Sequence, residues 1–189
     1  AVIEKLVKES IKKKIPILTF YTFSTENWRR PRKEISFLFK LIEEYFIKEI
    51  QNLKKNGVKI DILGNLKPLP NKIKKCLINS MKITKNCKKI RVNLAINYGS
   101  KYELLNVFKI LKRKKIKPSF KNIEKNLYTK GMPDPQILIR TGGVNRLSNF
   151  LLWQISYSEI YFIKKLWPDF NIKDYNKIIK DFRSVKRNF

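Results

Sequence analysis

The sequence predicts an α/β fold with a mostly parallel central sheet surrounded by helices. Three observations predict it. Short apolar runs rich in β-branched and aromatic residues alternate with longer segments whose apolar positions recur at helical spacing. Proline, glycine or asparagine stands at several of the junctions, as turns between strands and helices require. The 189 residues are enough to bury one core, and no repeat or low-complexity linker divides them, so residues 1–189 are expected to form one domain.

Helical periodicity and turn residues delimit the elements of the first half. A helix that ends before Pro16 precedes a short apolar run, which is typical of a buried parallel strand. The apolar stripe of the next helix runs to Gly57, and the strand after it closes at the turn formed by Gly64 and Asn65. The expected elements are therefore a helix over 2–14, a strand over 17–23, a helix over 34–56, a strand over 58–63 and a helix over 70–86.

The second half repeats the alternation with shorter elements. Its first run, from Ile90 to Ile96, is again apolar and β-branched, and two helical segments follow it. Strands that alternate with helices favour parallel pairing, because a parallel strand is reached through a crossover. The expected elements are a strand over 90–96, a helix over 102–115, a short helix over 122–128, strands over 136–140 and 159–162, and a helix over 172–185.

The composition excludes several classes of protein. Hydrophobic residues make up 43% of the chain and aromatic residues 12%, which excludes a disordered polymer. No apolar run approaches the roughly 20 residues of a membrane-spanning helix, and no basic and apolar leader opens the sequence, so a cytoplasmic location is expected. Histidine is absent, which excludes His-based catalysis and most zinc sites. The two cysteines match no metal-binding or disulfide spacing.

The net charge of +28 has two components. The 34 lysines are spread along the chain, as AT-rich coding DNA would produce, and predict a solvated cationic surface. Five of the nine arginines, in contrast, fall within residues 29–32 and 140–146. A guanidinium binds phosphate oxygens through two parallel hydrogen bonds, which the point charge of lysine cannot do. The clustered arginines are therefore the part of the charge that indicates a ligand.

Two segments carry the chemistry, and both are expected beyond the carboxyl ends of strands. Residues 24–31 read Ser-Thr-Glu-Asn-Trp-Arg-Arg-Pro, and residues 134–170 contain Arg-Thr-Gly-Gly followed by Arg-Leu-Ser-Asn. Gly142 and Gly143 would let the backbone approach a ligand, while neighbouring Arg and Ser side chains donate to phosphate. A helix cap and a simple glycine turn are the purely structural alternatives. The pattern predicts a phosphorylated ligand held between the two loops.

These residues carry a resemblance to a known family. Residues 21–28, the triplet Asn97-Tyr98-Gly99 and residues 140–170 resemble, in the same order, the cis-prenyltransferase family, and most closely its bacterial undecaprenyl diphosphate synthases. The resemblance implies an enzyme that adds isopentenyl diphosphate repeatedly to farnesyl diphosphate. It also implies a parallel sheet with surrounding helices and a hydrophobic tunnel for the growing chain.

The resemblance assigns one substrate and the metal to the second segment. The positions that match the binding site for the diphosphate of isopentenyl diphosphate are Arg140, Arg146, Leu147 and Ser148. Glu159 matches a metal-ligand position. A carboxylate oxygen suits Mg²⁺, which is the implied cofactor.

The first segment matches the loop that closes over the allylic substrate. Its matching positions are Ser24, Thr25, Glu26, Trp28 and Arg30. Asn27 matches the family's proposed proton acceptor, but an amide is a weak base, so a positioning or relay role is expected. Aromatic residues of the 34–56 helix would wall the tunnel or, equally, belong to an ordinary core; these are Phe37, Phe39, Tyr45 and Phe46.

The sequence departs from the family pattern at identifiable places. The phosphate-binding loop with its metal-binding aspartate has no counterpart, and Ala1 falls at the start of the helix that follows this loop. Val144 and Asn145 stand where family members carry glutamate and histidine. We therefore expect an N-terminally incomplete domain that lacks Asp-assisted metal binding and is inactive by itself.

Three functions remain open from the sequence. The first is a prenyltransferase that makes a long cis-polyprenyl diphosphate for cell-wall synthesis, as a homodimer with peripheral contact to the inner face of the cytoplasmic membrane. The second is a non-catalytic subunit of the same fold that dimerises with an active partner. The third is a basic nucleic-acid-binding module. Only the net charge of +28 favours it, so nucleic acid is not expected as a partner.

Overall fold

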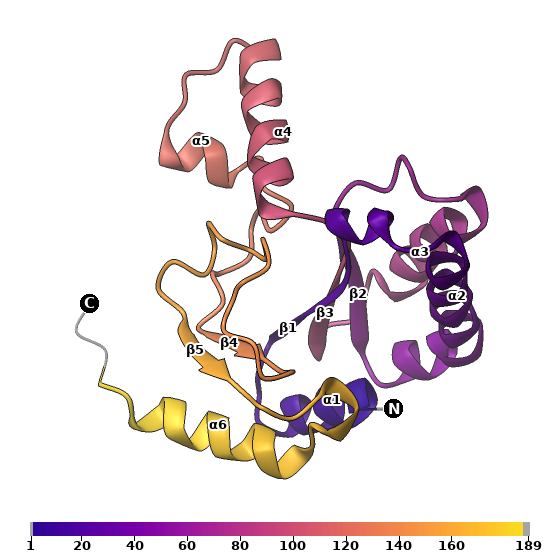
Figure 1. Ribbon diagram of the computed structural model, residues 1–189, viewed down its shortest axis with the longest axis vertical. Helices are drawn as coiled ribbons and strands as arrows, with labels where there is room; N and C mark the ends of the chain where they lie inside the picture. The colour runs from indigo at the N-terminus through magenta and orange to yellow at the C-terminus, as the bar shows by residue number, and fades with distance from the viewer. Residues whose placement is uncertain (1, 187–189) are drawn as a thin grey trace.

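The structure is a computed structural model that describes residues 2–186. Strands and helices alternate through most of the chain (Figure 1). The helices are α1 (Val2–Lys12), α2 (Arg32–Lys55), α3 (Asn71–Thr84), α4 (Ser100–Arg113), α5 (Phe120–Glu124) and α6 (Ile172–Ser184), with 3-10 turns η1 (Thr25–Arg29) and η2 (Trp167–Asp169). The strands are β1 (Ile17–Ser24), β2 (Val58–Leu63), β3 (Ile90–Tyr98), β4 (Ile137–Arg140) and β5 (Glu159–Phe162).

All strand pairs are parallel, but they form two sheets. Strands β1, β3 and β2 make a three-stranded sheet in the order β1-β3-β2, and β4 pairs with β5. The predicted α/β fold with a mostly parallel sheet and surrounding helices is confirmed, and within the described residues 2–186 its strands are divided between a three-stranded and a two-stranded sheet. Apolar side chains, not ladder hydrogen bonds, join the two sheets there. Phe20 of β1 and Ile139 of β4 pack against the same cluster around Leu6 and Ile178.

The alternation of side chains along β3 determines what covers each face of the larger sheet. Val92 and Leu94 point into the main core, where Phe39 and Phe46 of α2 and Leu77 of α3 meet them. Ala95, which follows Leu94, contributes to a second cluster with the segment around Phe150 and Leu151. Helices α2 and α3 therefore cover one face, while the loops after β4 cover the other. Helix α1 lies beside α6 at the edge of the molecule (Figure 1).

Helices α4 and α5 form an arm that projects from the rest of the fold (Figure 1). Its inner side is apolar and well packed, with Val107 and Leu111 of α4 against Ile123 of α5. Its outer side exposes Leu105, Phe108 and Phe120, the last with 76% of its surface accessible. The arm is therefore internally stable but leaves apolar surface without a partner in the described part of the chain.

The predicted elements are all present, and only their ends differ. The strand predicted over 90–96 extends two residues further to Tyr98, while the helix predicted over 102–115 begins at Ser100 and ends at Arg113. Among the aromatic residues of α2, Phe39 and Phe46 are core residues, whereas Phe37 is 62% exposed. The hydrophobic tunnel stays a prediction.

Two further features considered in the sequence are membrane-spanning helices and the two cysteines. Among residues 2–186, every helix is too short or too polar to cross a bilayer. Cys76 and Cys87 are free thiols.

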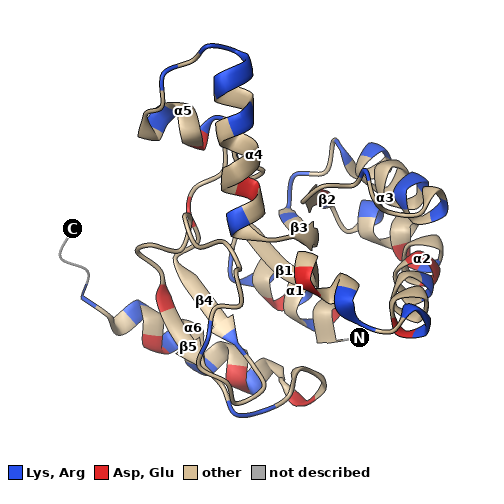
Figure 2. Cartoon of the chain, turned by 45° about the horizontal axis from the view of Figure 1, so that its top comes forward, with Lys and Arg blue, Asp and Glu red and all other residues tan. Residues whose placement is uncertain are grey.

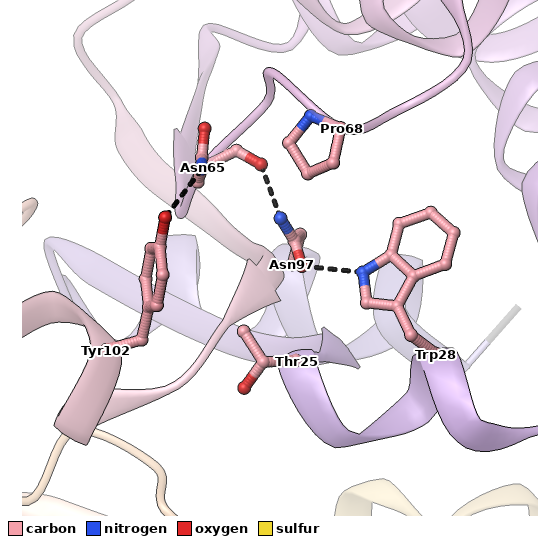
Figure 3. Close-up of a pocket in the computed structure, with 6 residues that line it drawn as sticks. All are labelled: Thr25, Trp28, Asn65, Pro68, Asn97 and Tyr102. Atoms are coloured by element: carbon pink, nitrogen blue, oxygen red, sulfur yellow. Dashed lines mark hydrogen bonds between the residues drawn. The ribbon is translucent and has the colours of Figure 1, made fainter.

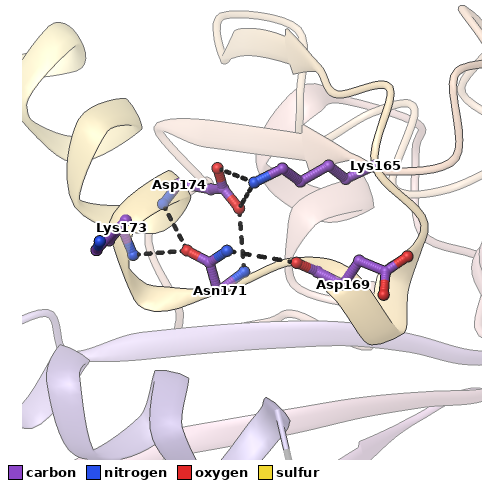
Figure 4. Close-up of polar contacts among 5 residues, drawn as sticks. All are labelled: Lys165, Asp169, Asn171, Lys173 and Asp174. Atoms are coloured by element: carbon purple, nitrogen blue, oxygen red, sulfur yellow. Dashed lines mark hydrogen bonds and ion pairs between the residues drawn. The ribbon is translucent and has the colours of Figure 1, made fainter.

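A polar network starts the last helix (Figure 4). The side-chain oxygen of Asn171 accepts hydrogen bonds from the backbone N–H groups of Lys173 and Asp174 at 2.9 and 3.2 Å. In return, Asp174 Oδ2 accepts from the backbone N–H of Asn171 at 3.2 Å, which completes a capping box. The Lys165 ammonium donates to both carboxylate oxygens of Asp174 at 2.8 Å and holds the pKa of that carboxyl below its usual range. Asp174 is therefore ionised at neutral pH.

We expect Asn171→Ala to destabilise the protein by about 1 kcal/mol, because the first turn of α6 loses the acceptor for two backbone N–H groups. For a chain of this size the melting temperature should fall by about 2–4 °C. Thermal unfolding followed by circular dichroism measures the shift. Lys180→Ala, an exposed change on the same helix, is the matched control. An equal shift in both variants would mean that the cap does not stabilise the helix.

Candidate active site

The candidate site lies beyond the carboxyl ends of the parallel strands. Because β1, β2 and β3 are parallel, η1 after β1, Asn65 after β2 and Asn97 near the end of β3 reach the same edge of the sheet. The loop after β4, which begins at Thr141, joins them from the second sheet. The two segments singled out in the sequence are therefore neighbours in space.

The η1 turn is shaped by its own side chains. Asn27 Oδ1 accepts a hydrogen bond from the backbone N–H of Ser24 at 2.9 Å. The ring of Trp28 packs edge-on against Phe23 and Phe39, with centroids 5.2 and 5.8 Å apart. Because the amide oxygen of Asn27 already serves the backbone, only its NH₂ group is open to a ligand. This geometry favours a positioning role for Asn27 and disfavours proton acceptance.

Arg140 is the best-placed cation of the loop after β4. It ends β4, is half-buried, and donates from Nη1 to the hydroxyl of Ser148 at 3.0 Å. Arg146 is exposed and forms no hydrogen bond or ion pair with the described residues, and Leu147 packs against the cluster around Phe150. The structure thus places Arg140 and Ser148 together as a donor pair, while Arg146 is free to turn toward a ligand.

The backbone of this loop carries local strain. Ser148, Asn149 and Leu151 have positive φ values of 50°, 62° and 48°. Non-glycine residues in this region cost of order 1 kcal/mol or more each, and such residues cluster at functional sites. Surrounding contacts keep these residues in this conformation. In it, the Ser148 hydroxyl accepts from Arg140 and the Asn149 amide donates to Glu26.

Gly142 and Gly143 do not offer their backbone to a ligand. The N–H of Gly142 donates to the carbonyl of Lys165 at 2.8 Å, and that of Gly143 donates to Ile163 at 3.0 Å. Both residues have positive φ, which explains the glycines. These two N–H groups extend the pairing of β4 and β5, so that donors to a phosphate would come from the neighbouring Arg and Ser side chains, as the sequence predicts; the close approach of a ligand to the glycine backbone stays a prediction.

Asn149 connects the two loops, and the sequence analysis did not assign it a role. Its Nδ2 donates to Glu26 Oε1 at 2.8 Å, and its Oδ1 accepts from the backbone N–H of Lys101 at 2.9 Å. Its carbonyl accepts from the N–H of Ser100 at 2.8 Å. One asparagine thus joins η1 in the first segment, the start of α4 and the loop after β4.

The carboxylate of Glu26 is stabilised in its charged form. Burial acts to raise its pKa, but hydrogen bonds from Asn149, from the backbone and from neighbouring hydroxyl groups outweigh this effect and lower it. The hydroxyl of Thr25 donates to Glu26 Oε2 at 3.1 Å. Glu26 is therefore an ionised acceptor at neutral pH, and its link to Asn149 is lost only as the pH falls through this lowered pKa.

Tyr21 supports the same loop from below, and sequence reasoning missed its role as well. Its hydroxyl donates to the carbonyls of Tyr98 and Ser148, both at 3.2 Å, and its ring stacks on Phe150 with centroids 4.4 Å apart. Burial, followed by the charge of Glu26, raises the pKa of Tyr21 to about 12. The hydroxyl therefore remains a donor at neutral pH.

A buried carboxylate lies beneath the loop. Glu103 of α4 is 1% exposed and accepts hydrogen bonds from the Tyr98 hydroxyl, the Tyr128 backbone N–H and Gln154 Nε2 at 2.6, 2.6 and 3.1 Å. Burial and then the Glu103 charge raise the pKa of Tyr98, so that hydroxyl keeps its proton. This network fixes α4 to the segments on either side of β4.

Two predicted site residues lie elsewhere. Arg30 Nη1 forms an ion pair with Glu34 Oε1 at 2.7 Å on the first turn of α2, so its guanidinium faces the helix. Glu159 begins β5, where it pairs with Ile137, whereas Arg140 pairs with Phe162 at the other end. Three residues of strand separate them, or about 10 Å. The structure does not bring Glu159 together with the arginine pair.

The described residues do not fit a magnesium site. Mg²⁺ needs a near-octahedral set of oxygens, of which several come from waters and one or two from carboxylates. Within residues 2–186 no three Asp, Glu, Cys or His side chains form a group that could hold a metal ion. Glu159 lies away from the loops, and Glu26 is engaged by Asn149 and Thr25.

A small cavity of about 310 Å³ opens beside η1 (Figure 3). It is lined by Thr25, Trp28, Asn65, Pro68, Asn97 and Tyr102. A larger hollow of about 770 Å³ lies at the opposite end of the sheet, among lysines near Cys87. Only the first cavity contains predicted site residues, which are Thr25 and Trp28.

A parallel α/β fold with arginine and serine side chains beyond its strand ends is typical of proteins that bind phosphate groups. Residues 1–189 match the family model for undecaprenyl diphosphate synthase. An isoprenyl transferase of Rickettsia typhi is 44% identical over 188 residues, which are 99% of this chain and 83% of that protein. One from Clostridium perfringens is 42% identical over 196 residues, with 99% and 77% coverage.

Solved structures agree with this match. A probable undecaprenyl diphosphate synthase from Campylobacter jejuni superimposes with a TM-score of 0.91 at 36% identity, over 100% of this chain and 89% of that one. Lavandulyl diphosphate synthase from Lavandula x intermedia, solved with dimethylallyl diphosphate, gives a TM-score of 0.93 at 24% identity over 99% and 84%, which shows the fold alone. The chain belongs to the undecaprenyl diphosphate synthase family of cis-prenyltransferases.

Gly99→Ala should separate the two loops. A Cβ at Gly99 would lie 2.5 Å from Thr25 Oγ1 and 2.7 Å from Asn149 Nδ2, so η1 and the Asn149 turn must move apart. We expect a loss of about 1–3 kcal/mol in stability and a weaker affinity for isopentenyl diphosphate in calorimetric titration.

Gly131→Ala is the control, because its positive φ strains any side chain although nothing lies within 4 Å of the added Cβ. It should lower stability without changing the affinity. Unchanged affinity in Gly99→Ala as well would show that the contact between the loops does not shape the binding site.

Proposed function

We propose that this chain condenses isopentenyl diphosphate with an allylic diphosphate, farnesyl diphosphate, to make a long cis-polyprenyl diphosphate that serves as the undecaprenyl carrier in cell-wall synthesis. The observation that carries the proposal is the hydrogen bond of 2.8 Å between Asn149 and Glu26. It holds the loop with Arg140 and Ser148 against the loop with Asn27 and Trp28. Two diphosphates bound to adjacent loops would have their reacting carbons close together.

The chemistry of this condensation needs little more than positioning and charge. The carbon–oxygen bond of the allylic diphosphate breaks, the alkene of isopentenyl diphosphate forms the new carbon–carbon bond, and a proton leaves the neighbouring carbon. Guanidinium groups stabilise diphosphate charge, and apolar surroundings protect the carbocation-like fragment from water. No covalent nucleophile is required, which agrees with a chain that contains no histidine.

The residues divide the two substrates between them. Arg140, Arg146 and Ser148, with Leu147 beside them, would hold isopentenyl diphosphate. The η1 turn would hold the allylic diphosphate, with Ser24, Thr25, Glu26, Trp28 and Arg30 at its surface. Arg30 must leave Glu34 to do so, and that exposed ion pair is worth little. Asn27 would orient a substrate through its NH₂ group, since its oxygen accepts from Ser24.

Magnesium and Glu159 remain predictions that rest on the resemblance. Because the described residues supply no cluster of metal ligands, no step of the proposed reaction is assigned to a metal ion here. The second candidate function, a non-catalytic subunit of this fold that dimerises with an active partner, is separated from the enzyme by experiment. Turnover of both diphosphates by the chain with added Mg²⁺ would support the enzyme. Binding without turnover would support the subunit.

The surface charge gives no separate function. In the described residues, lysine and arginine positions occur on all six helices and in the loops between them (Figure 2). The charge would attract anionic substrates or lipid headgroups at long range, an effect that salt screens. Peripheral membrane contact and a cytoplasmic location therefore stay part of the proposal.

Arg140→Ala should weaken isopentenyl diphosphate binding by about tenfold or more, because a half-buried charge-assisted pair of hydrogen bonds is lost. Arg146→Ala should weaken it by about fivefold or less, since this side chain is exposed. Isothermal titration measures both. Arg113→Ala at the end of α4 removes the same charge far from the loop and should change nothing. Equal losses of affinity in all three variants would mean that these arginines act only through long-range electrostatic attraction.

The α4–α5 arm supports the proposed homodimer. Leu105 and Phe108 share one side of α4, beside the buried stripe of Val107 and Leu111, and Phe120 adds a third exposed apolar side chain. A symmetric second copy presents the same apolar patch and would cover it.

Phe108→Glu should convert a dimer into a monomer in analytical ultracentrifugation, while Phe37→Glu on α2, an equally exposed position, should not. A wild type that sediments as a monomer would contradict the dimer. Co-sedimentation of that monomer with anionic vesicles would then assign the patch to membrane contact.

A further inference from the structure

Asn97 lies at the centre of the cavity beside η1, and the proposed function gives it no task. Its Oδ1 accepts a hydrogen bond from Trp28 Nε1 at 2.8 Å, and its Nδ2 donates to the carbonyl of Asn65 at 2.6 Å (Figure 3). Its own carbonyl accepts from the N–H of Asn65 at 3.3 Å. One side chain therefore links the ends of three parallel strands.

The position admits few residues other than asparagine. Asn97 has a φ of 49°, in the left-handed region that asparagine tolerates better than most residues, and it is 4% exposed. A buried amide must satisfy both its acceptor and its donor, and here Trp28 and Asn65 satisfy them. Gly64 permits this approach, since a Cβ there would lie 2.1 Å from the carbonyl oxygen of Ile96.

The hydrogen bond to Trp28 acts on the whole η1 turn. Packing against Phe23 and Phe39 holds one side of the indole, but 37% of Trp28 remains exposed, so the bond to Asn97 sets the direction of the ring. At the start of the turn, Asn149 holds Glu26. Asn27 therefore lies between Glu26, which is bound by the Asn149 amide, and Trp28, which is bound by the Asn97 amide.

We propose that Asn97 is a positioning residue that acts through Trp28 to hold η1 in the form that binds the allylic diphosphate. The proposal rests on the proposed function for its ligand, whereas the coupling between Asn97 and Trp28 stands on geometry alone. A merely structural Asn97 would stabilise the fold without a selective effect on one substrate.

The coupling is tested by nuclear magnetic resonance of the ¹⁵N-labelled protein. Its three tryptophans give three indole N–H signals, and Trp28→Phe identifies the one from Trp28. Asn97→Gly, which keeps the backbone free to adopt positive φ, should shift that signal and speed its hydrogen exchange, while the other two signals stay in place. Asn93→Ala is the matched control, because it changes an equally buried asparagine of the same strand, which contacts Thr19 and not η1. An unmoved Trp28 signal in Asn97→Gly overturns the proposal.

The effect on ligands is tested by titration with farnesyl diphosphate and with isopentenyl diphosphate. Asn97→Gly and Trp28→Phe should each weaken farnesyl diphosphate by about fivefold, the value of one neutral hydrogen bond, and the double variant should be no weaker than either. Isopentenyl diphosphate should bind all three variants as the wild type does. Equal weakening of both ligands, or additive losses in the double variant, would overturn the positioning role. If the wild type binds neither diphosphate, the proposed function fails, and the resonance experiment still decides the coupling.

Discussion

The hydrogen bonds that join β3 to β1 on one side and to β2 on the other bring η1, Asn65 and Asn97 to the same edge of the sheet. Because all three strands run in the same direction, their carboxyl ends meet at one edge, and Asn97, Tyr98 and Gly99 occupy its centre. The apolar residues of β3 pack one face of the sheet against α2 and α3. Polar contacts at the site are thus made on a rigid, well-packed base.

Polar side chains at this edge act mostly on one another. Amide groups of Asn97 and Asn149 satisfy both their donors and their acceptors with protein atoms. Arg146, in contrast, is exposed, and the NH₂ group of Asn27 makes no hydrogen bond to the described residues. Some polar groups therefore stabilise the site, and others are available to bind a ligand. The clustered arginines belong to the second kind, unlike the dispersed lysines.

The sequence predicted the helices and strands well because each has strong periodicity and clear turn residues. The sequence did not indicate that the strands divide into two sheets, because an apolar run does not reveal which strand it pairs with. In the structure, apolar side chains such as Phe20 and Ile139 connect the two sheets. Arg140 and Ser148 were found because their residue types match phosphate chemistry. Tyr21 and Asn149 were not assigned a role, because partners more than a hundred residues away carry no local signal.

The residues with positive φ in β3 and in the loop after β4 also limit which substitutions this sequence can accept. A mutational bias toward Lys, Ile and Asn meets no obstacle on a solvated helix surface. At a φ near 50–60°, however, the β-branch of isoleucine is sterically excluded, and asparagine is the favoured alternative to glycine. Codon bias and backbone geometry therefore point to the same residue at positions 97 and 149, and these two asparagines can persist in a chain whose surface is free to change.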